Sequence, residues 1–216
     1  MADYFYTPLP FVHGPTVSFV RRAMRFHLRP TVNPLGNGHQ GLCVIAFLAA
    51  VLFLSGCAAL QPEDFSKSKT RFELDRYFTG HTRSWGVFEN SAGEPRRYFT
   101  CDSFGQRDGA GDVILRQHFR FSDGKIQERE WHIHRVDSTH WEATANDMIG
   151  MAHGEGSGNA FYWEYTITLD RRNPLATVHI RQWMYQAEGT DTVMTRLVIT
   201  KLGVTVFEVS EVIHHQ

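Results

Sequence analysis

Cysteine is scarce in this sequence, which contains only Cys43, Cys57 and Cys101 among 216 residues. The first two lie inside an uncharged N-terminal run, so Cys101 is the one cysteine of the remaining chain. A single thiol cannot form an intrachain disulfide. A domain built from that chain must therefore be stabilised by its hydrophobic core, and 42% hydrophobic residues are enough to build one.

An excess of positive charge is also missing. Four arginines and one aspartate precede Cys57, so the chain from Cys57 onward keeps 18 Lys and Arg against 22 Asp and Glu, a formal charge of −4. No basic stripe is left to bind a phosphate backbone. We therefore do not expect nucleic acid as a partner.

Signatures of catalysis and of metal binding are lacking as well. No Gly-x-Ser-x-Gly elbow marks a nucleophile. The glycine-rich stretch 154–158 lacks the Gly-Lys-Ser/Thr ending of a phosphate loop, and we interpret it as a corner or loop between strands. His132 and His134 share one strand face, but only Glu130 accompanies them, and a metal site needs a third or fourth ligand. We therefore expect no catalytic residue, metal or cofactor, and no enzyme.

A run of twenty uncharged residues is present near the N-terminus, GLCVIAFLAAVLFLSGCAAL, at residues 41–60. Arginines precede it, and the first acid after it is Glu63. A basic region, an apolar region and small residues at the cleavage point describe a secretory signal peptide. Residues 54–57, Leu-Ser-Gly-Cys, resemble the bacterial lipobox, and the resemblance implies cleavage before Cys57 and acylation of this cysteine.

Acylation of Cys57 would attach the protein to a membrane. Each buried CH₂ contributes roughly 0.8 kcal/mol, so two or more acyl chains hold a protein firmly where one is marginal. Ala58 is not the aspartate that often retains bacterial lipoproteins in the inner membrane, and we expect an outer-membrane lipoprotein facing the periplasm. The alternative is an uncleaved transmembrane anchor, because twenty uncharged residues just span about 30 Å of hydrocarbon.

The sequence divides into three parts. Residues 1–56 form the leader with the lipoprotein signal peptide, and its length beyond the usual 15–30 residues indicates Met24 as an alternative start. Residues 57–70 contain the acylated cysteine and a polar tether, and residues 71–216 form the folded domain. A short helical turn begins this domain and buries four apolar residues, Phe72, Leu74, Tyr77 and Phe78.

Period-two alternation dominates the folded domain. Residues 113–121 alternate apolar and polar side chains, and Asp123-Gly124 then suits a tight hairpin turn into residues 125–135. The strongest alternation runs from Phe161 to Leu169. Three more segments follow, at residues 177–186, 192–201 and 204–213. About eight to ten consecutive strands predict an all-β fold, an antiparallel lipocalin-like β-barrel whose interior can hold a small ligand.

The segment ANDMIGMAHGEGSGNAFYWEY, at residues 145–165, resembles an uncharacterised family of bacterial lipoproteins, the DUF3833-type domain of unknown function, which is lipocalin-like. Residues 74–88 and 119–133 are similar to the same family. The resemblance implies a barrel and brings no established reaction. In one departure, Gln182 stands where we expect an aspartate. Any coordinating or catalytic role of that acid would be weakened here.

Two kinds of side chain are candidates for a ligand site. The domain's tryptophans would either line a pocket for an acyl or aromatic ligand or fill the core, and Trp131 belongs with them. Two short polar residues would either orient a ligand head group at the barrel mouth or bond the backbone of turns. The candidate ligand-binding residues are Trp85, Asp147, Asn159, Trp163 and Trp183.

The leading functional hypothesis is an outer-membrane lipoprotein that binds or carries an apolar, fatty-acyl-like ligand inside its barrel. Its expected partners are the membrane, through Cys57, and an apolar small molecule. Two alternatives stay open: an envelope scaffold or assembly factor without a ligand, and a lipid-modifying enzyme that uses Asp147 or a histidine.

Overall fold

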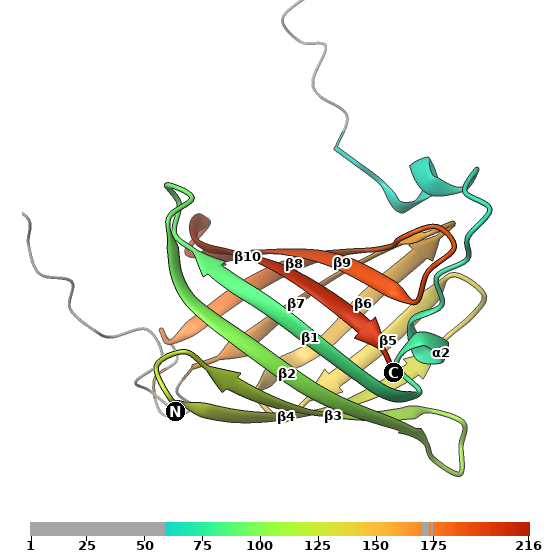
Figure 1. The fold of residues 1–216 in the computed structure, drawn as a ribbon, viewed down its shortest axis with the longest axis horizontal. Coiled ribbons are helices and arrows are strands. Elements are labelled where there is room, and N and C mark those ends of the chain that lie inside the picture. The colour runs from blue at the N-terminus through green and yellow to red at the C-terminus, as the bar shows by residue number, and fades with distance from the viewer. Residues whose placement is uncertain (1–58, 170–172, 174) are drawn as a thin grey trace, which may run out of the picture. The chain divides into compact units, whose positions relative to one another are not determined.

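The period-two alternation produces ten strands, and each of them pairs with the next strand along the chain. The computed structural model describes residues 59–169, 173 and 175–216. The strands are β1 (Gly80–Glu89), β2 (Pro95–Arg107), β3 (Val113–Phe121), β4 (Ile126–Arg135), β5 (His140–Ala145), β6 (Met148–Ser157), β7 (Ala160–Thr168), β8 (Thr177–Gln186), β9 (Thr192–Lys201) and β10 (Val204–His215). Because β10 also pairs with β1, the sheet closes into an antiparallel barrel without edges (Figure 1). The predicted lipocalin-like barrel is confirmed.

Alternate residues of each strand face the interior, and these are the buried ones. On β7 the inward side chains include Phe161, Trp163 and Tyr165, while their neighbours face outward. On β4, Trp131 and Ile133 are buried as the alternation predicts. One contiguous apolar core therefore lies inside the barrel, and its composition follows directly from the phase of the alternation.

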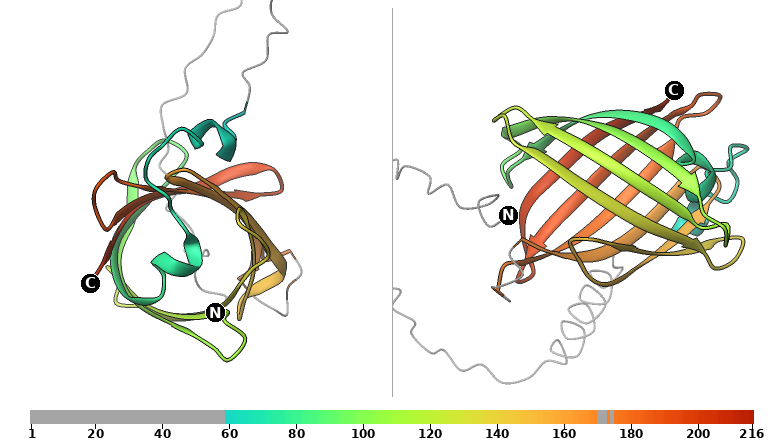
Figure 2. Two further views of the ribbon diagram at one scale, coloured as in Figure 1. Left: turned by 90° about the vertical axis from the view of Figure 1, so that its right-hand side faces the viewer. Right: turned by 90° about the horizontal axis from the view of Figure 1, so that it is seen from below.

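One end of the barrel is closed by the helix α2 (Leu74–Tyr77), which confirms the predicted helical turn. Its residue Leu74 is fully buried, and Phe72, Tyr77 and Phe78 pack into the same core. Figure 2 shows α2 inside the ring of strands at this end. We call it the capped end. The opposite end, where turns 122–125, 146–147 and 202–203 lie, is the uncapped end.

The segment expected to be a free polar tether is partly attached to the barrel. Residues Pro62–Phe65 form a short 3₁₀ helix, η2, in which Pro62 is buried. The Phe65 ring lies 5.9 Å from the Trp183 ring and 5.4 Å from the Tyr185 ring, on the outer face of β8. Farther along, the Phe72 N–H donates to the Gly158 carbonyl over 2.8 Å. Aromatic burial thus outweighs the polar composition of this segment.

The interpretation of residues 154–158 as a corner between strands is wrong for most of the stretch. Gly154 and Gly156 lie within β6 and face inward. A Cβ at Gly154 would come within 2.4 Å of the Phe161 ring, and one at Gly156 within 3.1 Å of the Trp141 ring. These glycines therefore make room for large aromatic side chains in the core. Only Gly158, with φ +55°, belongs to a turn.

The leader, the lipobox and Cys57 lie outside the described residues. Within the part of the chain that the structure describes, no helix is both long enough and apolar enough to cross a bilayer.

Candidate functional site

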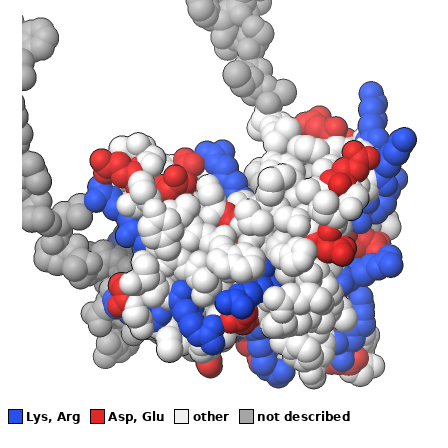
Figure 3. Space-filling view, viewed as in Figure 1, with Lys and Arg blue, Asp and Glu red and all other residues white. Residues whose placement is uncertain are grey.

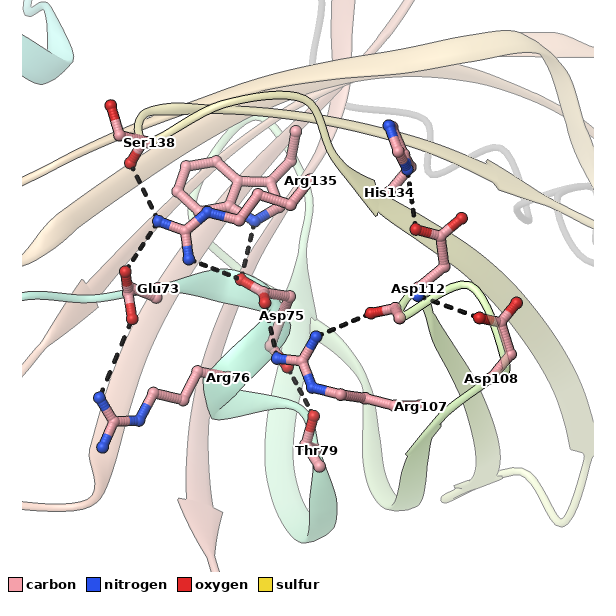
Figure 4. A network of polar contacts seen from close by, with 12 residues as sticks. Glu73, Asp75, Arg76, Thr79, Arg107, Asp108, Asp112, His134, Arg135 and Ser138 are labelled. Atoms are coloured by element: carbon pink, nitrogen blue, oxygen red, sulfur yellow. Dashed lines mark hydrogen bonds and ion pairs between the residues drawn. The ribbon is translucent and has the colours of Figure 1, made fainter.

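The capped end is tied together by a network around Asp75 of α2 (Figure 4). Arg107 Nη2 donates to Asp75 Oδ2 over 2.7 Å, and Trp141 Nε1 donates to Asp75 Oδ1 over 2.9 Å. Arg135 lies 3.8 Å from the same carboxylate and donates to Glu73 over 2.8 Å. Burial acts to raise the pKa of Asp75, but the bonds and charges of Arg107, Trp141 and Arg135 outweigh it, so the pKa lies below its ordinary value. Both carboxylate oxygens of Asp75 therefore have partners, and the network closes this end of the barrel.

Across the middle of the interior, inward polar side chains bond to one another. Gln182 Oε1 accepts from Trp163 Nε1 over 2.8 Å and from the Tyr165 hydroxyl over 3.3 Å. Gln182 Nε2 donates to Thr195 Oγ1 over 3.0 Å. Trp163 also stacks on Trp131, with ring centroids 4.8 Å apart. Gln182 therefore bonds three neighbours, and a carboxylate in its place would have no N–H to donate to Thr195.

A buried ion pair lies beside this group. Arg129 of β4 donates to Asp147 Oδ2 through Nε over 3.1 Å and through Nη2 over 2.6 Å. Asp147 comes from the β5–β6 turn, and its Oδ1 has no hydrogen-bond partner among the described residues. A charge in a low-dielectric interior needs such a partner, because removing one member leaves the other uncompensated. The pair thus neutralises the interior arginine.

Glu211 is the second interior acid. It lies on β10 between the buried Val209 and Ile213 and faces inward with them. Burial raises the pKa of its carboxyl from the ordinary 4.5 to about 7, although the Ser84 hydroxyl, which donates to it, and the charge of Arg129 act to lower it. Within the described residues, no cationic side chain forms an ion pair with Glu211. Among these residues, Glu211 therefore lacks a direct counter-ion.

Five phenylalanines surround the interior toward the uncapped end, and we call them the phenylalanine cluster: Phe88, Phe99, Phe119, Phe121 and Phe207. Their ring centroids lie 5.6–6.4 Å apart. The Phe99 ring covers Gly86, where a Cβ would come within 2.3 Å of it. Gly86 is the register partner of Glu211, so the cluster reaches the position beside this acid.

The two halves of the interior differ in accessibility. In the capped half, Phe161, Leu74 and Val113 expose no surface at all. Toward the uncapped end, the inward residues Phe88, Phe119 and Phe207 are only partly buried, and so are Leu197 and Glu211 near the middle of the interior. An inward side chain of a closed barrel meets solvent only through the lumen or its mouth. Inward side chains are therefore less completely enclosed in the middle and toward the uncapped end than at the capped end.

The structure separates the predicted site residues. Trp163 is buried in the interior, and Asp147 lies in the β5–β6 turn at the uncapped end. Asn159 lies in the β6–β7 turn at the capped end, where its Nδ2 donates to the Gln186 carbonyl over 3.1 Å. Asp147 and Asn159 thus lie at opposite ends of the barrel.

Two of the predicted tryptophans face away from the lumen. Trp85 points outward from β1 and is 48% exposed. It is in register with Val212, which is in register with Met194, so the three form an apolar stripe on the exterior. Figure 3 shows a largely uncharged central area on this face. Trp183 also points outward and stacks with Tyr185. Neither of the two tryptophans lines the interior.

Sequence reasoning missed Arg129 and Glu211. Both residues could have been found in the sequence, because each occupies a position that the alternation of its apolar neighbours assigns to the inward face. Arg129 precedes Trp131 by two residues, and Glu211 lies between Val209 and Ile213. A charged residue in an inward phase is rare in a core and marks a polar site.

The two histidines of β4 remain on the exterior. His134 Nδ1 lies 2.7 Å from Asp112 Oδ1, and His132 Nε2 lies 3.3 Å from Glu130. Among the described residues, no group of three or more His, Cys, Asp or Glu side chains has the arrangement of a metal site.

No curated protein matches this chain. One solved structure with a similar chain trace is a protein of unknown function from the DUF3598 family of Nostoc punctiforme (10% identity, TM-score 0.49). The match covers 68% of this chain and 51% of that protein. A second is an S-type phycobiliprotein lyase from Guillardia theta (9% identity, TM-score 0.49, 71% and 96% of the two chains), and a third is a protein from M. tuberculosis (13% identity, TM-score 0.46, 65% and 93%). The chain thus spans about half the length of the first of these. A model of the family described as a protein of unknown function (DUF3833) matches residues 51–215, and the chain belongs to this family, as its sequence resemblance indicates.

Proposed function

We propose that the uncapped half of the lumen binds an apolar, fatty-acyl-like ligand. The observation that carries this proposal is that Phe88, Phe119 and Phe207 face inward in a closed barrel and are only partly buried. Apolar surface contributes roughly 25 cal/mol per Å² when it leaves water. An alkyl chain that leaves water and packs against Phe119 and Phe88 would gain this free energy, whereas a water molecule in the same position would not.

Native mass spectrometry and solvent extraction of the segment from Gln61 onward test the proposal directly. This segment contains all ten strands and the whole described core, so it is a self-contained folding unit. A co-purifying apolar molecule, or binding of the fluorescent probe N-phenylnaphthylamine, is expected. Protein that stays empty and binds no probe would contradict the proposal and favour the scaffold alternative.

A matched pair of variants locates the binding. Leu197 faces the lumen on β9, and Met194 faces outward on the same strand. Leu197→Trp fills the lumen, so we expect probe affinity to fall about tenfold or more, while Met194→Trp leaves it unchanged. Equal effects of the two substitutions would place the probe outside the lumen.

We also propose that the protein is an outer-membrane lipoprotein anchored through Cys57 and facing the periplasm. The support is the lipobox at residues 54–57 and its apolar context. Replacing Cys57 with Ala is expected to abolish labelling by radioactive palmitate and to block processing at this position. Labelling that persists in the variant would rule out acylation of Cys57.

A further inference from the structure

Glu211 differs from the other ionisable groups that reach the accessible part of the lumen. Arg97, at the uncapped end, pairs with Asp123 over 2.9 Å, and the interior Arg129 pairs with Asp147. Each of the two arginines thus forms an ion pair with an aspartate, whereas Glu211 forms none with a cation among the described residues. A free fatty acid would bring a second carboxylate toward this uncompensated acid and would have to compete with Asp147 for Arg129. The charge of the lumen therefore disfavours a carboxylate head group.

The surroundings of Glu211 suit a cationic donor. Its register partners are Gly86 of β1 and Thr195 of β9. Thr195 brings a hydroxyl oxygen, and the Phe99 ring, which covers Gly86, brings an aromatic surface. An ammonium group has three N–H donors and no acceptor, binds carboxylates through strong charge-assisted bonds and is attracted to aromatic faces. These three features are adjacent at the point where the phenylalanine cluster begins.

We propose that the ligand of the lumen is an amphiphile with an amine head group, which Glu211 binds while the phenylalanine cluster holds its apolar chain. This inference rests on the proposed function, because it needs an accessible lumen. It names the chemical class of the ligand and assigns Glu211 as the residue that selects it.

The electrostatics around Glu211 agree with this assignment. Among the described residues, the titratable groups that interact with the charge of Glu211 are Arg129, Tyr165, Tyr77 and Cys101, and Arg129 is the only cation of these four. Without a ligand, burial keeps part of the Glu211 population protonated near neutral pH. A bound ammonium supplies the missing counter-charge, so binding at pH 6 should ionise Glu211 and release a proton to the solvent.

The experiment compares three probes that share a twelve-carbon chain: dodecylamine, dodecanol and dodecanoate. Each is titrated below its micellar concentration by displacement of N-phenylnaphthylamine from the segment beginning at Gln61. The full-length chain in neutral-lipid nanodiscs checks that the segment represents the intact protein. We expect dodecylamine to bind at least tenfold more tightly than dodecanoate, with dodecanol between them.

Glu211→Gln and Glu208→Gln form a matched pair. Glu208 lies on the same strand but pairs outward with Arg196 over 2.6 Å, so its replacement removes a carboxyl group of the same strand without touching the lumen. Glu211→Gln should weaken dodecylamine about tenfold and leave dodecanol within about threefold, and Glu208→Gln should change neither. Calorimetry at pH 6 in buffers of different ionisation enthalpy should show proton release on dodecylamine binding by the wild type and none by Glu211→Gln.

The outcomes separate this inference from the proposed function. If none of the three probes binds, the lumen proposal fails. If dodecanol and dodecanoate bind but dodecylamine has no advantage, or if Glu211→Gln keeps the amine affinity and the proton release, the lumen binds ligands and the assignment of Glu211 is overturned. Circular dichroism of both variants confirms that each retains the barrel.

Discussion

The capped end of this barrel and the middle of its interior each contain an acidic side chain, but the two acids have opposite surroundings. Asp75 accepts from Arg107 and Trp141 and lies close to Arg135, and its pKa lies below the ordinary value. Glu211 accepts from Ser84 and forms no ion pair with a cation among the described residues, and burial raises its pKa to about 7. The first acid is bound on every side by its own chain. For the second acid, the described residues supply the hydroxyl of Ser84 and the charge of Arg129.

The same contrast applies to the aromatic residues of the two halves. Phe161 is enclosed by Phe72, Trp141 and Trp163, with ring centroids 5.5–6.2 Å apart, and exposes nothing. Phe119 packs against Phe99 and Phe121 but keeps part of its surface accessible. The aromatic side chains of the two halves thus differ in how completely they are enclosed. Substitutions in the two halves should therefore have different consequences.

The largest expected effect is on stability in the capped half. Phe161→Ala removes a fully enclosed ring and should lower the free energy of unfolding by about 3–5 kcal/mol. Phe119→Ala should cost about 1–2 kcal/mol, because part of its ring already meets solvent, and should weaken probe binding instead. Urea denaturation monitored by circular dichroism measures both. Equal losses of stability would show that the two halves are packed alike.

The next effect concerns the closure at α2. Asp75→Asn keeps the shape but removes the charge that faces Arg107 and Arg135, and it should lower the free energy of unfolding at pH 7 by about 2–3 kcal/mol, because Arg107 is partly solvated. Since the folded-state pKa of Asp75 is depressed, its contribution is present above the unfolded-state pKa of about 4 and is lost as pH falls. The difference between variant and wild type should therefore shrink below about pH 4. Urea titrations at pH 7 and pH 3 test this, and a difference that does not depend on pH would contradict it.

Most of the fold could be predicted from the sequence. Segments 177–186 and 192–201, read from alternation alone, coincide with β8 and β9, and the helical turn at Leu74 was also correct. Alternation fixes which side of a strand faces the core, and consecutive hairpins leave few topologies. The prediction from alternation failed at Gly154 and Gly156. A glycine inside a strand resembles a turn residue unless the aromatic ring that occupies the space of its missing side chain is known.

The candidate site was less predictable, for a different reason. Residue type suggested Trp85 and Trp183, but their phase on the strands places both outside the barrel. Glu211 and Arg129 follow the inward phase, yet their polarity made them look like surface residues. The sequence does not indicate which arginine–aspartate pair lies beside the interior acid. The residues concerned belong to strands far apart in the sequence, such as β4, β7 and β10. Alternation contains no information on the distances between these strands across the lumen.

A smaller effect should appear in the pH dependence of stability that Glu211 causes in the middle of the interior. Because the folded-state pKa of Glu211 is raised from 4.5 to about 7, the folded state binds the proton more tightly, so its contribution to stability falls as pH rises across this window. Contact with solvent in the lumen reduces the cost of ionisation, and we expect about 1–2 kcal/mol. Glu211→Gln should match the wild type near pH 5 and exceed it by that amount at pH 8 in urea denaturation. A wild type that is equally stable relative to the variant at both pH values would show that Glu211 is well solvated.

The smallest expected effect lies at the rim of the uncapped end, in the turn between β9 and β10. Leu202 and Gly203 both have positive φ, 50° and 80°, as a two-residue type I′ turn requires, and the Leu202 side chain is 91% exposed. A branched residue in this conformation is strained and gains no burial in return, whereas asparagine adopts it readily. Leu202→Asn should therefore raise the free energy of unfolding by about 0.5–1 kcal/mol, while Leu175→Asn, at another exposed leucine that lacks a positive φ, should change it little. Thermal denaturation of the two variants measures the difference, and unchanged probe affinity in Leu202→Asn would show that the strain at this rim is separate from the binding properties of the lumen. A loss of affinity would instead mean that the strained leucine takes part in ligand entry, and the rim would then belong to the functional half of the barrel.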